Sequence, residues 1–340
     1  MSTPSKRVVH CIRSDSFAGV ERYVVNVAPE LARRGWDVRV IGGEPDRMRK
    51  ELGTIRHTPA ATTRAVAAEL LHCTSDTLVH AHMTAAEAAA VAARTLRRFP
   101  LLATRHFAAP RGSTIIGRLG ARLIRGAIDR QIATSRFVAE GISEPSTVVL
   151  NGVPVNDDPP RPERMVLMAQ RLEREKCADV AIRAWAESTL RNHGWRLTLA
   201  GSGRQAAELV ELVDGLGLHD SVEFVGVQAN MQSLMSRAGI FLATTPADAF
   251  GFSVVEAMAA GVPVVAARGG GHLETVGAAD DRCLFPIGDW GAAAAALDAL
   301  GTDPVERIRL GFALQVWQRA HLSIERHVDQ LEQVYSELSR

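Results

Sequence analysis

The chain has few cysteines, almost no net charge and no long apolar run. Its four cysteines lie far apart and form no C-x-x-C pair, which excludes a zinc ribbon or a disulfide framework and favours reduced thiols in a cytoplasmic protein. The net charge of +1 argues against a general nucleic-acid binder. The first apolar stretch, residues 8–12, is too short for a signal-peptide core or a membrane span.

Short β-rich runs alternate instead with helical patterns. The predicted strands are residues 8–12, 38–41, 78–81, 101–104, 131–133, 165–168, 196–200, 222–225, 240–243 and 262–266. This alternation is typical of βα units with parallel sheets, and a chain of this length favours two domains. The polar, proline-rich segment 156–163 is predicted to be the linker. We therefore predict an α/β protein of two facing Rossmann-like domains, with ligands bound beyond the strands' carboxyl ends in a cleft between them.

The most informative segment is DAFGFSVVE at residues 248–256, in which two carboxylates stand eight positions apart. A glycine-containing turn is predicted to run into a helix, with Asp248 in the loop and Glu256 in the first helical turn. The free N–H groups and positive dipole of that helix point into the same space. Such a place suits a phosphorylated, polyhydroxylated ligand. A structural alternative exists for Glu256, because Ser253 and Glu256 have the spacing of a capping box.

This segment resembles the E-x7-E signature of retaining glycosyltransferases with the GT-B fold, specifically family 4. Other segments resemble the same family in the same order: AGVER at 18–22, QRLEREK at 170–176, LAGSG at 199–203, FVG at 224–226 and GGGHLE at 269–274. The resemblance implies an acceptor-binding N-terminal domain, residues 1–155, and a nucleotide-sugar-binding domain, residues 156–320. It also implies that a final helix, residues 321–340, crosses back onto the N-terminal domain.

The resemblance further implies a hexosyltransferase that moves a sugar from a nucleoside-diphosphate sugar to an acceptor hydroxyl with retention of configuration. A UDP-sugar is expected and a GDP-sugar is the alternative. Neither a metal nor a cofactor is expected, so Arg171 and Lys176 would neutralise the leaving diphosphate. His106 would lie near the donor sugar and the reacting centre, and Asp248 would contact sugar hydroxyls. These four residues are the predicted catalytic set.

The predicted donor-binding set, also implied by the resemblance, overlaps with the catalytic one. It comprises Gly19, Arg171, Lys176, Gly201, Gly203, Val225, Phe250, Gly251, Phe252 and Glu256. Glu256 would accept hydrogen bonds from ribose hydroxyls. Two positions depart from the family pattern, because Asp248 replaces a longer glutamate and Ala18 replaces a glycine.

Two alternatives belong to other classes of protein. The departures at Ala18 and Asp248 suggest a non-catalytic protein that binds sugar nucleotides. The segment GSGRQA at 201–206 matches a dinucleotide fingerprint and suggests an NAD(P)-dependent oxidoreductase.

A basic stretch stands out between residues 94 and 136. Arg118, Arg122 and Arg125 recur at spacings of four and three and are predicted to share one helix face. We expect this face to meet a phosphorylated or lipid-linked acceptor, or the anionic inner face of a membrane in a peripheral contact. The alternative is an ordinary solvated surface.

Overall fold

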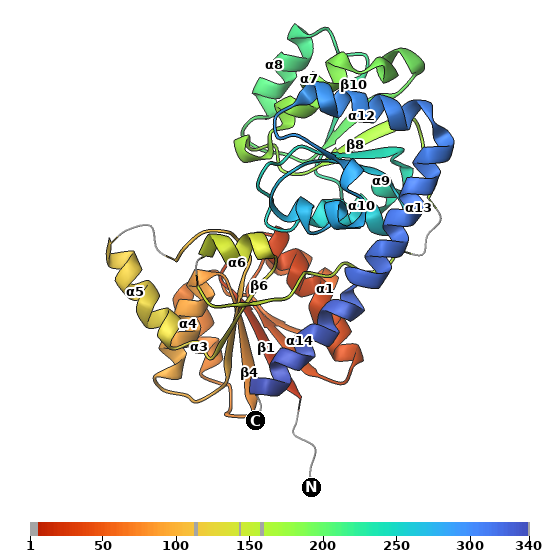
Figure 1. The fold of residues 1–340 in the computed structure, drawn as a ribbon. Coiled ribbons are helices and arrows are strands. Elements are labelled where there is room, and N and C mark those ends of the chain that lie inside the picture. The colour runs from red at the N-terminus through yellow and green to blue at the C-terminus, as the bar shows by residue number, and fades with distance from the viewer. Residues whose placement is uncertain (1–5, 112–114, 143, 157–159, 339–340) are drawn as a thin grey trace. The chain divides into compact units, whose positions relative to one another are not determined.

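The computed structural model describes residues 6–111, 115–142, 144–156 and 160–338, which form two compact units (Figure 1). The first unit comprises the described parts of Met1–Gly152 and Ile324–Arg340, and the second those of Val153–Ser323. The chain therefore leaves the first unit after Gly152 and re-enters it at Ile324, whereas the sequence placed the two boundaries after residues 155 and 320.

A seven-stranded parallel sheet, in the order β3-β2-β1-β4-β5-β6-β7, forms the centre of the first unit. Its strands are β1 (Arg7–Ile12), β2 (Asp37–Ile41), β3 (Arg56–Thr58), β4 (Thr77–His82), β5 (Leu101–Arg105), β6 (Arg130–Ala133) and β7 (Thr147–Val148). Parallel strands are covered on both faces, so the central strands are buried almost throughout; every residue of β4 is buried.

Helices lie on both faces of this sheet (Figure 1). They are α1 (Gly19–Arg33), α2 (Pro45–Leu52), α3 (Thr63–Leu70), α4 (Thr84–Arg94), α5 (Ile115–Gly126), α6 (Arg136–Ile142) and α14 (Ile324–Leu338). The last of them, α14, buries Ile324, Val328, Leu331 and Tyr335, which recur at helical spacing and form one face. This face brings α14 against α1, which confirms that the final helix returns to the N-terminal part of the fold.

The second unit contains a six-stranded parallel sheet in the order β10-β9-β8-β11-β12-β13. Its strands are β8 (Met165–Ala169), β9 (Arg196–Ala200), β10 (Val222–Gly226), β11 (Ile240–Ala243), β12 (Val264–Ala267) and β13 (Leu284–Phe285). Its α-helices are α7 (Ala178–Glu187), α8 (Ala206–Gly215), α9 (Met231–Arg237), α10 (Phe252–Ala259), α11 (Val276–Ala279), α12 (Trp290–Thr302) and α13 (Pro304–His321). Four 3-10 turns complete it: η1 (Arg174–Lys176), η2 (Thr189–His193), η3 (Gly270–Leu273) and η4 (Asp281–Cys283).

The carboxyl edge of each sheet carries most of the residues predicted to act. In the first unit, Gly19 follows β1 and His106 follows β5. In the second unit, the segment 170–176 follows β8, Gly201 follows β9 and Asp248 follows β11. Parallel sheets place their ligand sites at this edge. Among the described helices, each is too short or too polar to cross a membrane.

Candidate functional site

The loops after β8 and β11 meet because these two strands are neighbours in the sheet. The Gln170 side-chain amide and the Thr244 hydroxyl both donate to the carbonyl of Lys176, at 2.9 and 3.1 Å. The Thr245 hydroxyl donates in turn to the Gln170 side-chain oxygen at 3.0 Å. Polar groups from both loops thus fix the backbone of Lys176. This sets the direction of the Lys176 side chain.

The Lys176 ammonium forms an ion pair with Asp248, with Nζ 2.6 Å from Oδ2. The other oxygen, Oδ1, accepts hydrogen bonds from the backbone N–H groups of Phe250, at 3.2 Å, and Gly251, at 2.8 Å. Burial alone would raise the pKa of Asp248, but Lys176 outweighs burial and holds that pKa below its usual value. Asp248 is therefore charged, and both of its carboxylate oxygens bond to groups of the protein itself. Its contact with a sugar stays a prediction.

Helix α10 begins directly after this loop. Gly251 is its N-cap, with a φ of 84° that favours glycine, and no side chain caps the free N–H groups there. Glu256 is consequently the fifth residue of α10 rather than a first-turn residue, and Ser253 lies inside the helix. The predicted first-turn placement and the capping-box interpretation are both wrong.

The two phenylalanines beside Gly251 differ in what they offer to a ligand. Phe250 is 2% exposed and packs edge-to-face against Phe252 with ring centroids 5.2 Å apart. Its side chain belongs to the core, so a donor-binding role of Phe250 is limited to its backbone. Phe252, the first residue of α10, is half-buried.

The three glycines at 269–271 support the Asp248 loop. The Gly271 N–H donates to the Asp248 carbonyl at 2.7 Å. A Cβ atom on Gly270 would lie 2.4 Å from that same carbonyl oxygen, and one on Gly269 would lie 2.1 Å from the Pro246 oxygen. Real side chains do not fit there, so this glycine run allows two backbones to touch.

His272, which follows these glycines, is a residue that the sequence pattern did not single out. It is fully buried, and its Nδ1 lies 3.0 Å from the Ala267 carbonyl and must donate to it. Burial lowers the pKa of His272, so the ring is neutral, and its other edge lies beside Gly251. The sequence signal that could have identified His272 is its position directly after the glycine run 269–271, the loop that packs on Asp248.

The remaining predicted donor residues of the second unit surround the same edge. A Cβ on Gly201 would lie 1.9 Å from the Gln170 oxygen, and one on Gly203 would lie 2.1 Å from the Leu172 oxygen. Close backbone packing therefore accounts for both glycines, and their donor contact stays a prediction. Arg171 is 60% exposed and pairs with Glu175 at 2.9 Å. Val225 is half-buried in β10.

In the first unit, Gly19 is the first residue of α1 and nothing lies within 4 Å of a Cβ built on it. Glu21 reaches back to accept the Ala18 N–H at 2.9 Å, and the Ser14 hydroxyl also donates to Glu21. This carboxylate caps the helix and leaves the space beside Gly19 open. The glycine therefore permits a close backbone approach by a ligand.

His106 follows β5 at the same edge of the first sheet. Burial lowers its pKa to about 3, so the ring is neutral at pH 7. Its Nε2 lies 3.1 Å from Nδ1 of His82, the last residue of β4. The functional role of His106 stays a prediction, but its orientation is set by a second histidine.

Within the described residues, one group has the spacing of a metal site: the ligand atoms of His10, His80 and His82 lie within 4.8 Å of one another. These rings already bond to one another or to hydroxyl groups, with His80 Nε2 next to the Thr104 hydroxyl. No carboxylate belongs to the group. We assign no metal to it.

Acidic residues from outside the basic stretch neutralise much of its charge. Arg111 pairs with Glu87 at 2.5 Å and also with Glu144, which lies 3.9 Å from Arg125. The Arg118 side chain lies outside the described residues. Arg122 is exposed, so the predicted anion-binding face depends on it and stays a prediction.

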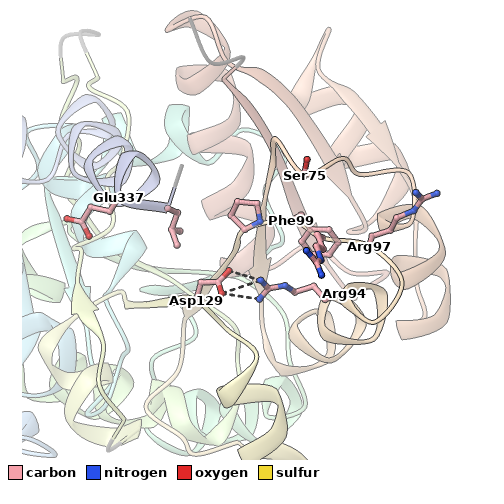
Figure 2. Close-up of a pocket in the computed structure, with 9 residues that line it drawn as sticks. Ser75, Arg94, Arg97, Phe99, Asp129 and Glu337 are labelled. Atoms are coloured by element: carbon pink, nitrogen blue, oxygen red, sulfur yellow. Dashed lines mark hydrogen bonds and ion pairs between the residues drawn. The ribbon is translucent and has the colours of Figure 1, made fainter. Parts of the chain in front are cut away.

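A pocket of about 620 Å³ lies at the opposite, amino edge of the first sheet. Figure 2 shows Arg94, Arg97 and Glu337 on its walls, with Arg94 paired to Asp129. Its position before β5 and β6 separates it from the carboxyl-edge residues described above.

Comparison with known families assigns nearly all of the chain. Residues 156–313 match the model for glycosyl transferases group 1, and residues 17–157 match the model for Glycosyltransferase Family 4. A lipopolysaccharide core biosynthesis mannosyltransferase of Rhizobium leguminosarum bv. viciae is 26% identical over 95% of this chain and 94% of its own length.

Other relatives match only in part. An exopolysaccharide phosphotransferase of Streptomyces coelicolor is 37% identical over 41% of this chain, and an N-acetyl-alpha-D-glucosaminyl L-malate synthase of Bacillus anthracis is 30% identical over 43%. The matching stretches span 15% and 38% of those two proteins.

Solved structures share the fold over the whole chain. The Anabaena protein HepE in complex with UDP has a TM-score of 0.80 at 19% identity, covering 97% of this chain and 100% of HepE. Its complex with UDP-glucose gives 0.81 at the same identity, covering 97% and 99%. The lipopolysaccharide outer core galactosyltransferase WaaB gives 0.70 at 17% identity, covering 97% of this chain and 99% of WaaB.

Proposed function

Because this chain belongs to the family 4 glycosyltransferases and has the GT-B fold, we propose that it transfers a hexose from a nucleoside-diphosphate sugar to an acceptor hydroxyl. The family match leaves the oxidoreductase alternative without support. A non-catalytic protein that binds sugar nucleotides remains the alternative that an experiment must separate.

One observation carries the proposal: Lys176 is held 2.6 Å from Asp248 beside the uncapped start of α10. The ammonium and the free N–H groups of the helix both favour an anion. A diphosphate brings more negative charge than Asp248 alone supplies, and Arg171, exposed in the loop after β8, adds a planar set of donors. These features of the second unit support a site there for the diphosphate of a donor.

We propose front-side displacement with retention at the anomeric carbon. The acceptor oxygen forms a bond to that carbon while the bond from the carbon to the diphosphate oxygen breaks. The acceptor proton passes to an oxygen of the departing diphosphate. Lys176 and Arg171 stabilise the charge that grows on this leaving group, in place of a metal ion.

A UDP-sugar is the donor that we propose. Support comes from the Anabaena complexes, which contain UDP and UDP-glucose in a protein of the same fold. Glu256, in the body of α10, is proposed to accept hydrogen bonds from the ribose hydroxyls. A GDP-sugar is the alternative donor.

The acceptor is proposed to be phosphorylated or lipid-linked, with the enzyme in the cytoplasm and in peripheral contact with the inner membrane face. Three relatives are named for lipopolysaccharide core biosynthesis, which supports this class of acceptor. On the protein, the exposed Arg122 with the neighbouring exposed Leu123 supports such a contact.

The test is a thermal-shift screen against UDP-, GDP-, ADP- and dTDP-sugars, with and without EDTA, followed by product analysis by NMR. A bound donor at one hundred times its Kd stabilises the protein by about 2.7 kcal/mol. We expect a UDP-sugar to give the largest shift and an α-linked product from an α-linked donor, with EDTA having no effect. Activity that EDTA abolishes and manganese restores contradicts the metal-free mechanism. Donor binding without transfer or hydrolysis supports the non-catalytic alternative.

A further inference from the structure

The core of the first unit contains five buried histidines: His10, His80, His82, His106 and His327. Burial lowers the pKa of each, so all five are neutral at pH 7. A neutral imidazole carries its proton on one nitrogen and accepts on the other. The partners of each ring therefore decide where its proton lies.

One hydrogen-bonded chain through this core, the anchored chain, has a fixed direction. His327 Nδ1 lies 2.7 Å from the Leu150 carbonyl, which can only accept, so Nδ1 carries the proton. His327 Nε2 must then accept from the Tyr23 hydroxyl at 3.1 Å.

Two further contacts join His80 to hydroxyl groups. His80 Nε2 lies 2.5 Å from the Thr104 hydroxyl, and His80 Nδ1 lies 2.8 Å from the Tyr335 hydroxyl. A hydroxyl can donate or accept, so these two contacts leave the tautomer of His80 open. The anchored chain is therefore Leu150, His327 and Tyr23.

A second chain, the open chain, has no such anchor. His10 Nδ1 lies 3.0 Å from His82 Nε2, and His82 Nδ1 lies 3.1 Å from His106 Nε2. Each of these two contacts needs one N–H group and one lone pair. If His10 donates, all three rings carry the proton on Nδ1; if His10 accepts, all three carry it on Nε2. The three rings must have the same tautomer.

The two ends of the open chain face different surroundings. His10 Nε2 is buried in β1 and has no hydrogen-bond partner in the described part of the chain. His106 Nδ1 makes no hydrogen bond to the described residues and lies at the carboxyl edge of the sheet. No hydrogen bond among the described residues fixes the direction of the open chain, so a ligand at His106 can set it.

We propose that His10 and His82 are positioning residues that let His106 act either as a donor or as an acceptor toward a ligand oxygen. A ligand hydroxyl that donates to His106 Nδ1 selects the Nε2–H form of all three rings. A ligand phosphate or carbonyl oxygen that accepts from His106 selects the Nδ1–H form. The inference rests on the proposed function, because it supposes a substrate beside His106.

The first test measures tautomers directly in the full chain. Protein labelled with 15N-histidine is studied by long-range 1H–15N correlation at pH 7.5, with signals assigned through single histidine variants. We expect His10, His82 and His106 to share one tautomer, and His327 to carry its proton on Nδ1. Mixed tautomers among the three, a charged ring among them, or stoichiometric bound zinc in the purified protein would overturn the proposal.

The second test separates positioning from simple support of the fold. His82→Phe keeps the ring but cuts the open chain, and it should lower kcat at least about tenfold through misplacement of His106, with the donor KM nearly unchanged. His82→Asn restores a polar group near Nδ1 and should recover much of the loss. Tyr335→Phe is the matched control, since it removes a hydroxyl that contacts His80, outside the open chain, and should leave the tautomers of the open chain unchanged.

Equal kcat in the parent and His82→Phe would overturn the positioning role. If His82→Phe does not fold, the tautomers of the parent protein still decide the proposal. Failure of the proposed function would appear separately, as absence of nucleotide-sugar binding in the thermal-shift screen, whatever tautomers the spectra show.

Discussion

The aspartate at position 248 links the Lys176 side chain to the turn that starts α10. Its Oδ1 closes the turn that starts α10 and its Oδ2 holds Lys176. A longer side chain at this position would have to give up one of these contacts or shift the loop. Both residues were predicted from the sequence, but their pairing was not, because they stand far apart in the chain and meet only through the neighbouring strands β8 and β11.

The first prediction separates these two roles. Asp248→Asn keeps an oxygen for the Phe250 and Gly251 N–H groups but removes the charge that holds Lys176. Lys176→Ala removes the cation and leaves a partly buried carboxylate unpaired. We expect Lys176→Ala to cut turnover by about two orders of magnitude, as expected for loss of one group that stabilises transition-state charge, and Asp248→Asn to have a smaller effect. Steady-state kinetics with the preferred donor measure both.

Stability provides the control for this pair of variants. The pKa of Asp248 lies below its usual value in the folded protein, so its ion pair stabilises the fold above that usual value and the benefit is lost as the pH falls. Lys176→Ala should therefore unfold more easily than the parent at pH 7. If Lys176→Ala keeps full turnover, the assignment of Lys176 to the diphosphate is wrong.

The second prediction concerns Glu256. Because Gly251 rather than Ser253 is the N-cap of α10, Glu256 forms no capping box at the start of this helix. Glu256→Gln should weaken donor binding about tenfold, the loss of one charge-assisted hydrogen bond, with little change in melting temperature. Calorimetric titration with the donor and a thermal melt test it. A large fall in melting temperature at unchanged affinity would assign Glu256 to the fold instead.

Among the elements, the glycine-rich loops provide the third prediction. Gly270 has a φ of 55° and its Cβ would meet the Asp248 carbonyl, whereas a Cβ on Gly19 meets nothing within 4 Å. Gly270→Ala should destabilise the protein by about 1–3 kcal/mol through strain and displacement of the Asp248 loop. Gly19→Ala should leave the stability nearly unchanged and lower activity only if a ligand approaches that backbone.

Urea unfolding and kinetics on both variants provide the measurement. If Gly270→Ala and the parent are equally stable, the Asp248 loop can shift at little cost in free energy. Full activity of Gly19→Ala would remove Gly19 from the donor-binding set.

The strands show how far the pattern alone predicts elements. The ten predicted strands all exist, and two of them, β9 and β11, have the predicted bounds. Three short strands were missed: β3, β7 and β13, of two or three residues each. Each of these strands lies at an end of its sheet and pairs with one neighbouring strand. Strands this short carry too little of the β pattern to be recognised from the sequence.

At the scale of the whole molecule, the buried histidines predict unequal acid stability. Burial lowers the pKa of His10 and His106 to about 3 and that of His327 to about 4, against about 6.5 in the unfolded chain. Below pH 6.5 the unfolded state binds more protons than the folded one. Stability is therefore complete above that pH and falls as the pH decreases toward 4.

The fourth prediction is that the first unit unfolds before the second on acidification. His272 is the one fully buried histidine in the described part of the second unit, which thus serves as an internal control. Incubation between pH 7 and pH 4, followed by a brief hydrogen-exchange pulse at one common pH, should show early loss of protection in β1, β4 and β5. Simultaneous loss in both units, or earlier loss in the second, contradicts the prediction.

The histidine core also marks the limit of prediction from sequence for the candidate site. His106 was predicted, and His82 is the last residue of β4, but the path from His10 to His106 depends on β1, β4 and β5 lying side by side. Strand order depends on tertiary packing, and the alternation of strand and helix patterns in the sequence does not reveal it. Hydrogen-bond direction depends further on atoms, such as the Leu150 carbonyl, that every residue possesses.

The two crossings of the chain between the units have a consequence for its synthesis. The Val153 N–H donates to the Leu322 carbonyl at 3.0 Å, and Gln318 donates to the Val153 carbonyl at 3.1 Å, so the two crossing segments are joined within the second unit. A ribosome makes α14 only after every residue of the second unit. Until then His80 and Tyr23 lack their partners Tyr335 and His327, and α1 lacks the helix that covers it. The N-terminal unit is thus the last to be completed, and a nascent chain that stops early retains an open core that proteases can recognise.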